Sequence, residues 1–183
     1  MVGRKIFACL ATVAVAVSLA ACGGGGSSSG VSAGAYVKSI CNAIGPFEKD
    51  VASRSSALNL SNITSATQGK KALQDFLSAI VADTDQAVNK LKTAGSPNVN
   101  NGKKISGAIV SAFSQVKTAL TQAQGQANSL PTTDPTAFKN AAQNLGNGIR
   151  SSMGNIGSSL TNLKSPELET AAKKERACSN LGA

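Results

Sequence analysis

The fold of this chain is decided by residues 65–94, SATQGKKALQDFLSAIVADTDQAVNKLKTA. Apolar residues recur in this stretch at alternating spacings of four and three, which is typical of a helix with one buried face. The positions with this spacing, which we expect to form the buried face, are Leu73, Leu77, Ile80, Thr84, Ala87 and Leu91. Ser65 and Gln68 form a capping box at the start, and the breakers of residues 95–98 follow the end. The stretch therefore predicts a long helix that packs in a bundle.

Segments on both sides of this stretch have the same periodicity. The earlier segment, which begins at Ala35, places apolar residues at Tyr36, Val37, Ile40, Cys41, Ile44, Phe47 and Val51. The later segment places them at Ile105, Ile109, Ala112, Val116, Ala119, Ala123, Ala127 and Leu130. Both are predicted to be helices. Gly45-Pro46 lies inside the earlier one, and we expect a kink or a break there because proline lacks a backbone donor and clashes with the preceding turn.

A fourth helix is predicted from Asp134-Pro135, which reads as an N-cap followed by the first helical residue. Its apolar face consists of Phe138, Ala142, Leu145, Ile149, Met153, Ile156, Leu160 and Leu163. Its interior also contains Gly146, Gly148, Gly154 and Gly157, each of which costs about 1 kcal/mol relative to alanine. Close approach of a neighbouring helix would explain Gly154 and Gly157, and a mobile or ligand-facing surface is the alternative.

A short fifth helix is predicted to begin at Ser165-Pro166-Glu167 and to extend to Cys178, with acidic residues at its positive end. No strand pattern is present. Long helices joined by short loops predict an all-α fold, an up-and-down bundle of four to five helices in a single domain over residues 35–183.

The N-terminal segment has the features of an export signal. Arg4 and Lys5 precede the apolar run of residues 6–21, which is too short for a comfortable membrane-spanning helix. The run ends in Leu19-Ala20-Ala21-Cys22, which resembles a bacterial lipobox, where the cysteine is lipidated and becomes the first residue of the mature chain. We therefore expect a signal peptide over residues 1–21 and a lipidated, flexible Gly/Ser linker over 22–34. A general secretory signal that happens to contain a cysteine is the alternative.

The charge is positive but dilute. Loss of residues 1–21 removes two of the 18 basic residues and none of the nine acidic ones, which leaves a formal charge of +7. Nucleic-acid binding usually requires a basic cluster or stacking aromatic residues, and this chain has one tyrosine and no tryptophan. We therefore expect no nucleic-acid partner, and the charge favours a solvated face near anionic lipid headgroups or cell-wall polymers.

The four cysteines are predicted to have three different roles. Cys9 leaves with the signal peptide and Cys22 carries the lipid, so that Cys41 and Cys178 remain as an even pair in an oxidising compartment. A Cys41–Cys178 disulfide is the prediction. Two buried free thiols or a redox pair are the alternative, although the chain has no histidine to activate a thiol.

Residues that could support catalysis are scarce. The absence of histidine removes the usual general base and the commonest metal ligand. Asp83 and Asp85 are two residues apart on a predicted helix and so point to different faces, as do Glu167 and Glu169. No serine lies in a nucleophile elbow, and no glycine-rich loop follows a strand. We expect no enzymatic activity, no cofactor and no metal.

The cysteines near both ends of the helical region carry a resemblance to known proteins. Tyr36-Val37-Lys38-Ser39-Ile40-Cys41 opens this region, Ala177-Cys178-Ser179 closes it, and residues 91–99 lie between them. With the lipobox, these motifs resemble the small secreted lipoproteins of actinobacteria, whose function is generally unassigned. The resemblance implies a lipid anchor, a bundle and a bridge, and it supplies no catalytic residue.

The functional expectation is a membrane-anchored, extracytoplasmic lipoprotein that acts as a non-enzymatic structural or interaction module of the cell envelope. Its partners would be the membrane, through the anchor, and an envelope protein or cell-wall component. The alternative is a carrier or sensor that binds an apolar or cell-wall-derived ligand in a groove at Phe47, Met153 and Ile156. A third hypothesis, an exported regulator of a neighbouring enzyme, requires an exposed apolar patch.

Overall fold

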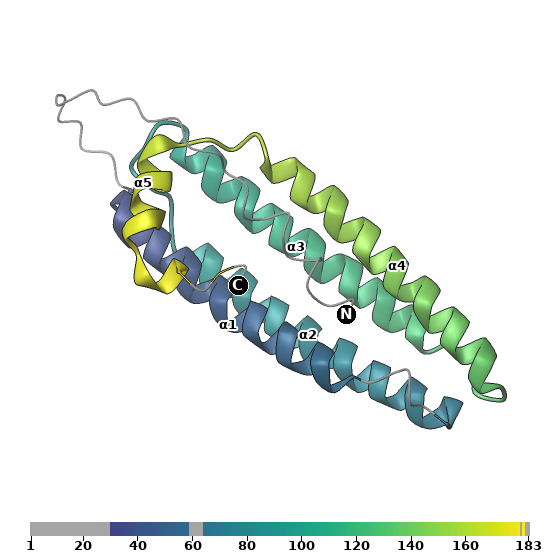
Figure 1. Ribbon diagram of the computed structural model, residues 1–183. Coiled ribbons are helices and arrows are strands. Elements are labelled where there is room, and N and C mark those ends of the chain that lie inside the picture. Colours follow the sequence, from purple (N-terminus) through teal and green to yellow (C-terminus); the bar gives the residue numbers. More distant parts are fainter. Residues whose placement is uncertain (1–29, 59–63, 180, 182–183) are drawn as a thin grey trace, which may run out of the picture.

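The fold is an antiparallel bundle of helices, seen in a computed structural model that describes residues 30–58, 64–179 and 181 (Figure 1). The elements are α1 (Ala33–Ala57), α2 (Ala66–Thr93), α3 (Gly102–Ala127), α4 (Pro135–Leu160), α5 (Pro166–Lys174) and the 3-10 turn η3 (Arg176–Cys178). The described residues contain no strand, only an isolated bridge between Val31 and Pro97. The predicted all-α up-and-down bundle is confirmed.

The helices begin where the sequence places their caps. The hydroxyl of Ser65 accepts a hydrogen bond from the backbone N–H of Gln68, and Asp134 accepts one from Thr136 at 2.8 Å. Ser165 caps α5 in the same way. Each of these side chains satisfies a backbone donor that the first turn of a helix leaves free.

The core lies along α2, which packs against α1 on one side and α3 on the other. Every predicted stripe position of α2 is buried. One cluster joins α2 to α3 and the first half of α4 around Leu77 and Phe138, both with 0% exposure. A second cluster joins α1, α2 and α3, where the rings of Phe47 and Phe113 meet edge to face with centroids 5.9 Å apart.

The sequence predicts a kink or a break at Gly45-Pro46, but helix α1 runs through these residues as one helix, so the break does not occur. Pro46 lies on the exposed side of the helix. The carbonyl that loses its hydrogen bond belongs to Asn42, which is also exposed, so water can replace the missing donor. Helix α1 also starts at Ala33, two residues before the predicted start, because Ser32 caps it.

Helix α4 is buried only in its first half, at Phe138, Ala142 and Leu145. The proposed close approach of a helix at Gly154 and Gly157 is wrong, because a Cβ atom added at either position would meet nothing within 4 Å. Within the described ranges, no helix is both long enough and apolar enough to cross a membrane.

Candidate functional site

A disulfide joins the first helix to the last turn of the chain. Cys41 and Cys178 are 137 residues apart in sequence, and the bond holds their Cα atoms 5.1 Å apart. The predicted bridge is therefore present. Because η3 follows α5 after a single residue, the bond also holds α5 against α1.

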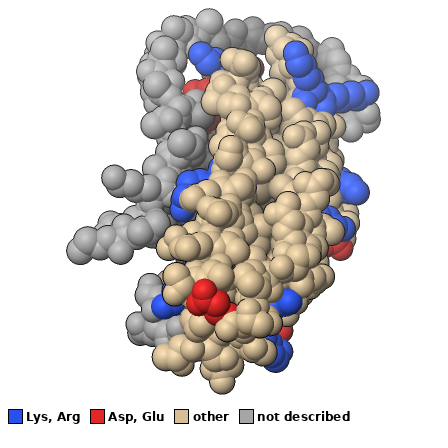
Figure 2. Space-filling view, turned by 90° about the vertical axis from the view of Figure 1, so that its right-hand side faces the viewer, with Lys and Arg blue, Asp and Glu red and all other residues tan. Residues whose placement is uncertain are grey.

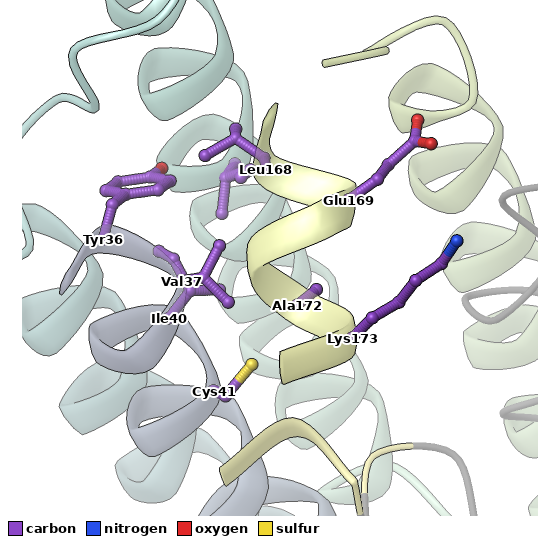
Figure 3. A pocket seen from close by; sticks show the side chains of 9 residues that line it. Tyr36, Val37, Ile40, Cys41, Leu168, Glu169, Ala172 and Lys173 are labelled. Carbon is purple, nitrogen blue, oxygen red and sulfur yellow. The ribbon is translucent and has the colours of Figure 1, made fainter. Parts of the chain in front are cut away.

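An apolar pocket of about 350 Å³ lies beside this disulfide, between α1 and α5. Its walls are formed by Tyr36, Val37 and Ile40 of α1, Ile109 of α3, and Leu168 and Ala172 of α5. Figure 3 shows Leu168 on the side of α5 that faces α1, and Ala172 also lines the pocket. The spacing of four between these two residues places both on one face of the short helix. The volume is at the lower end of the range for small-molecule sites.

The charged lining residues, Glu169 and Lys173, also come from α5. Their charged ends point away from Tyr36 and Val37 in Figure 3. The interior of the pocket is therefore apolar, and charge is confined to one side of its outer edge.

Tyr36 supplies the polar group of the pocket. Its side chain is 2% exposed, and burial raises the pKa of its hydroxyl to about 12. The hydroxyl points toward Leu168 (Figure 3) and forms no hydrogen bond with another described residue. Because this hydroxyl has no partner among the described residues and the open pocket leaves it within reach of solvent, it is an available hydrogen-bond donor for a ligand that enters the pocket.

The three residues predicted to line a groove lie elsewhere, and none of them lines this pocket. Phe47 packs against Phe113, because the helix continues through Pro46 and keeps Phe47 in the core. Met153 and Ile156 are half-buried in the second half of α4. Sequence reasoning missed the pocket, although the apolar stripe of Tyr36, Val37 and Ile40 and the apolar face of α5 were visible in the sequence.

The carboxylates of Asp83 and Asp85 form contacts between helices. Asp83 of α2 faces Arg54 of α1 at 3.5 Å, and Asp85 accepts a hydrogen bond from Lys117 of α3. This hydrogen bond and the charge of Lys117 lower the pKa of Asp85. The two aspartates therefore point to different helices, as their spacing predicts. Among the described residues, no three His, Cys, Asp or Glu side chains are grouped so that they could hold a metal ion.

The arrangement can bind an apolar molecule and donate one hydrogen bond to it. No protein-family model, curated protein or solved structure matches the chain.

Proposed function

We propose that this protein is an exported lipoprotein, anchored through Cys22, whose bundle acts outside the membrane as a non-enzymatic structural or interaction module of the cell envelope. The observation that carries the proposal is the Cys41–Cys178 disulfide. Disulfides persist in oxidising compartments and are rare in reducing ones. A bond between the two remaining cysteines therefore supports export, which is what the N-terminal segment also indicates.

The lipid anchor is proposed from the sequence Leu19-Ala20-Ala21-Cys22. Two acyl chains on one cysteine, each contributing about 0.8 kcal/mol per buried methylene, exceed the marginal hold of a single chain. Cys22 lies eleven positions before Ala33, the first residue of α1, so the anchor would hold the bundle close to the bilayer. We place the protein with the small secreted lipoproteins of actinobacteria on the same motifs.

Metabolic labelling with a fatty-acid analogue tests the anchor. The wild-type chain is expected to incorporate the label and to partition into detergent, and Cys22→Ser to lose both properties. Cys9→Ser is the matched control, because it changes a cysteine of the same N-terminal segment outside the lipobox. Equal labelling of the wild type and Cys22→Ser would contradict the proposal.

A second candidate function, a carrier or sensor for an apolar ligand, is favoured by the α1–α5 pocket. The pocket combines apolar walls with the free hydroxyl of Tyr36. Tyr36 is the only tyrosine and the chain has no tryptophan, so intrinsic fluorescence reports on this site alone.

Titration with a fatty acid below its micellar concentration tests the second candidate. We expect a saturable change in fluorescence that Ala172→Leu removes, because the larger side chain fills the pocket. Ala52→Leu, at an exposed position of α1, is the control. No saturable change in the wild type, or equal responses in all three proteins, would reject this candidate.

A further inference from the structure

The positive charge of this protein is concentrated at one end of the bundle. We define the α5 end as residues 33–38, 90–104 and 164–178, which comprise the start of α1, the α2–α3 connection and the region from the end of α4 to η3. Its nine basic residues are Lys38, Lys90, Lys92, Lys103, Lys104, Lys164, Lys173, Lys174 and Arg176. Only three acidic residues, Glu167, Glu169 and Glu175, lie there, so its formal charge is +6. The rest of the chain after residue 21 has seven basic and six acidic residues.

The basic side chains of the α5 end are available to a partner. All nine residues are exposed. None of them forms a salt bridge with another described residue. The three salt bridges among the described residues involve other basic side chains, those of Arg54, Lys71 and Lys117. In Figure 2, blue side chains predominate at the top of the molecule, which is the α5 end, whereas blue and red side chains lie together near the bottom.

Two of the three acidic residues at this end are already engaged in local contacts. Glu167 accepts a hydrogen bond from the Ser165 hydroxyl, and Glu175 accepts one from the backbone N–H of Ala177. These carboxylates stabilise the starts of α5 and η3, and they keep their negative charge, which the formal charge of +6 already includes.

The chain enters the bundle at the same end. The backbone of Val31 donates a hydrogen bond to Ser96 at 3.0 Å and accepts one from Asn98 at 2.7 Å. The first described residue, Gly30, therefore lies against Ser96 and Asn98 of the α2–α3 connection. Residues 22–29 can span no more than about 29 Å when fully extended. A lipid on Cys22 would keep the α5 end nearest the bilayer.

We propose that the α5 end docks on the anionic headgroups of the membrane to which the chain is anchored, with the opposite end of the bundle facing outward. The inference rests on the proposed anchor for its geometry and on the charge distribution for its chemistry. Lysines attract an anionic surface within about one Debye length, roughly 8 Å at physiological ionic strength. The anchor supplies a high effective concentration, so that a weak attraction suffices to orient the bundle.

Vesicle binding by the unlipidated mature chain tests the docking independently of the anchor. The protein is residues 22–183 with Cys22→Ser, which contains every described helix and the disulfide. We expect it to bind vesicles that contain one third phosphatidylglycerol, to lose this binding as salt rises, and not to bind pure phosphatidylcholine vesicles. Absence of binding to anionic vesicles, or equal binding to both kinds, would overturn the proposal.

Paired substitutions locate the surface. Lys103→Gln with Lys104→Gln is expected to lower partitioning onto anionic vesicles about tenfold or more. Lys49→Gln with Lys71→Gln, two exposed lysines outside the α5 end, is the matched control and is expected to lower it less than threefold. Thermal unfolding verifies that both variants remain folded.

If both double variants lose vesicle binding to the same extent, the proposed surface is overturned. A competition experiment adds soluble poly(glycerol phosphate) to protein bound to anionic vesicles. If the polymer displaces the protein as strongly as free vesicles of equal phosphate content do, the surface binds a wall polymer, and membrane docking is overturned. Fatty-acid labelling at Cys22 remains a separate measurement, so a failure of docking is distinguishable from a failure of the anchor.

Discussion

At the scale of single residues, Tyr36 is the most informative side chain. It is almost fully buried in the first turns of α1, and burial raises its pKa. Among the described residues that line the pocket, Tyr36 provides a polar group on the inner side, whereas the charged ends of Glu169 and Lys173 point away from it. A phenylalanine would fill nearly the same space, so packing alone does not require the hydroxyl group. In the second candidate function, this hydroxyl forms a hydrogen bond with the bound ligand.

The raised pKa of Tyr36 predicts a loss of stability at high pH. Well below pH 10 both the folded and the unfolded state keep the proton, and stability does not depend on this group. Between pH 10 and about 12 the unfolded state loses its proton first, so the free energy of unfolding falls, by about 2 to 3 kcal/mol at most. Tyrosinate absorbance of the folded protein should have its midpoint well above 10.

Tyr36→Phe is the control for this prediction. Its stability should depend less on pH in the same range, because the only tyrosine has been removed. A titration midpoint near 10 in the folded wild-type protein would contradict the burial of the hydroxyl.

At the scale of elements, α1 and α4 each contain residues that helices usually avoid. Helix α1 accommodates Pro46 within an unbroken helix, on its exposed side. Helix α4 has glycines where it is least buried, and no neighbouring atom requires their small size. Both features reduce intrinsic helix stability, so these helices depend on tertiary packing.

Pro46→Ala should stabilise the protein. The substitution restores a backbone hydrogen bond and removes a clash, and it changes no buried contact, so we expect the free energy of unfolding to rise by about 1 to 3 kcal/mol in urea titrations. Pro135→Ala is the control, because the first helical position tolerates proline and should respond by less than about 1 kcal/mol. Destabilisation by Pro46→Ala would show that the packing needs a distortion of α1 at this position.

Gly148→Ala and Gly154→Ala should each raise the free energy of unfolding by up to about 1 kcal/mol. Both residues are exposed in the helix, and an added methyl group meets nothing within 4 Å. Gly102→Ala should do the opposite, because its Cβ atom would collide with the carbonyl oxygen of Pro97. Urea titrations of the three variants measure these effects, and destabilisation by the first two would indicate a packing role that the contacts do not show.

At the scale of the whole molecule, the disulfide closes the fold and sets the position of the pocket. Cys41 and Cys178 join elements that are distant in sequence, and α5 is held between that bond and the end of α4. The pocket, the disulfide and the α5 end all lie in the same region. The rest of the chain after residue 21 has nearly balanced charge, and it includes the packed core of α2, α3 and α4.

Removal of the disulfide should cost on the order of 4 to 5 kcal/mol, because it releases a very long loop in the unfolded chain. Urea unfolding of the wild type with and without reductant measures this cost without a change of sequence. Cys41→Ala with Cys178→Ala should match the reduced protein, apart from a small packing loss at buried Cys41. Hydrogen exchange should also show α5 losing protection first. Unchanged stability after reduction would contradict this role.

Local patterns predicted most of this architecture. The stripe from Leu73 to Leu91 and the caps at Ser65 and Asp134 depend on neighbouring residues, and their predictions are confirmed. Whether α1 breaks at Pro46 depends on which side of the helix faces solvent. The sequence of a single helix does not reveal this, because it depends on how the other helices pack. The pocket depends on the position of α5, which a disulfide between distant cysteines determines. Local sequence patterns therefore did not indicate which residues line the pocket.

The chain that we propose is exported, anchored at Cys22 and closed by the Cys41–Cys178 disulfide. Intact-mass spectrometry of protein purified from its own membranes tests it most directly, with thiols alkylated before and after reduction. We expect a species that begins at acylated Cys22 and that takes up two alkyl groups, at Cys41 and Cys178, only after reduction. An unacylated chain that retains residues 1–21, or one that is alkylated at both cysteines without reduction, would contradict it.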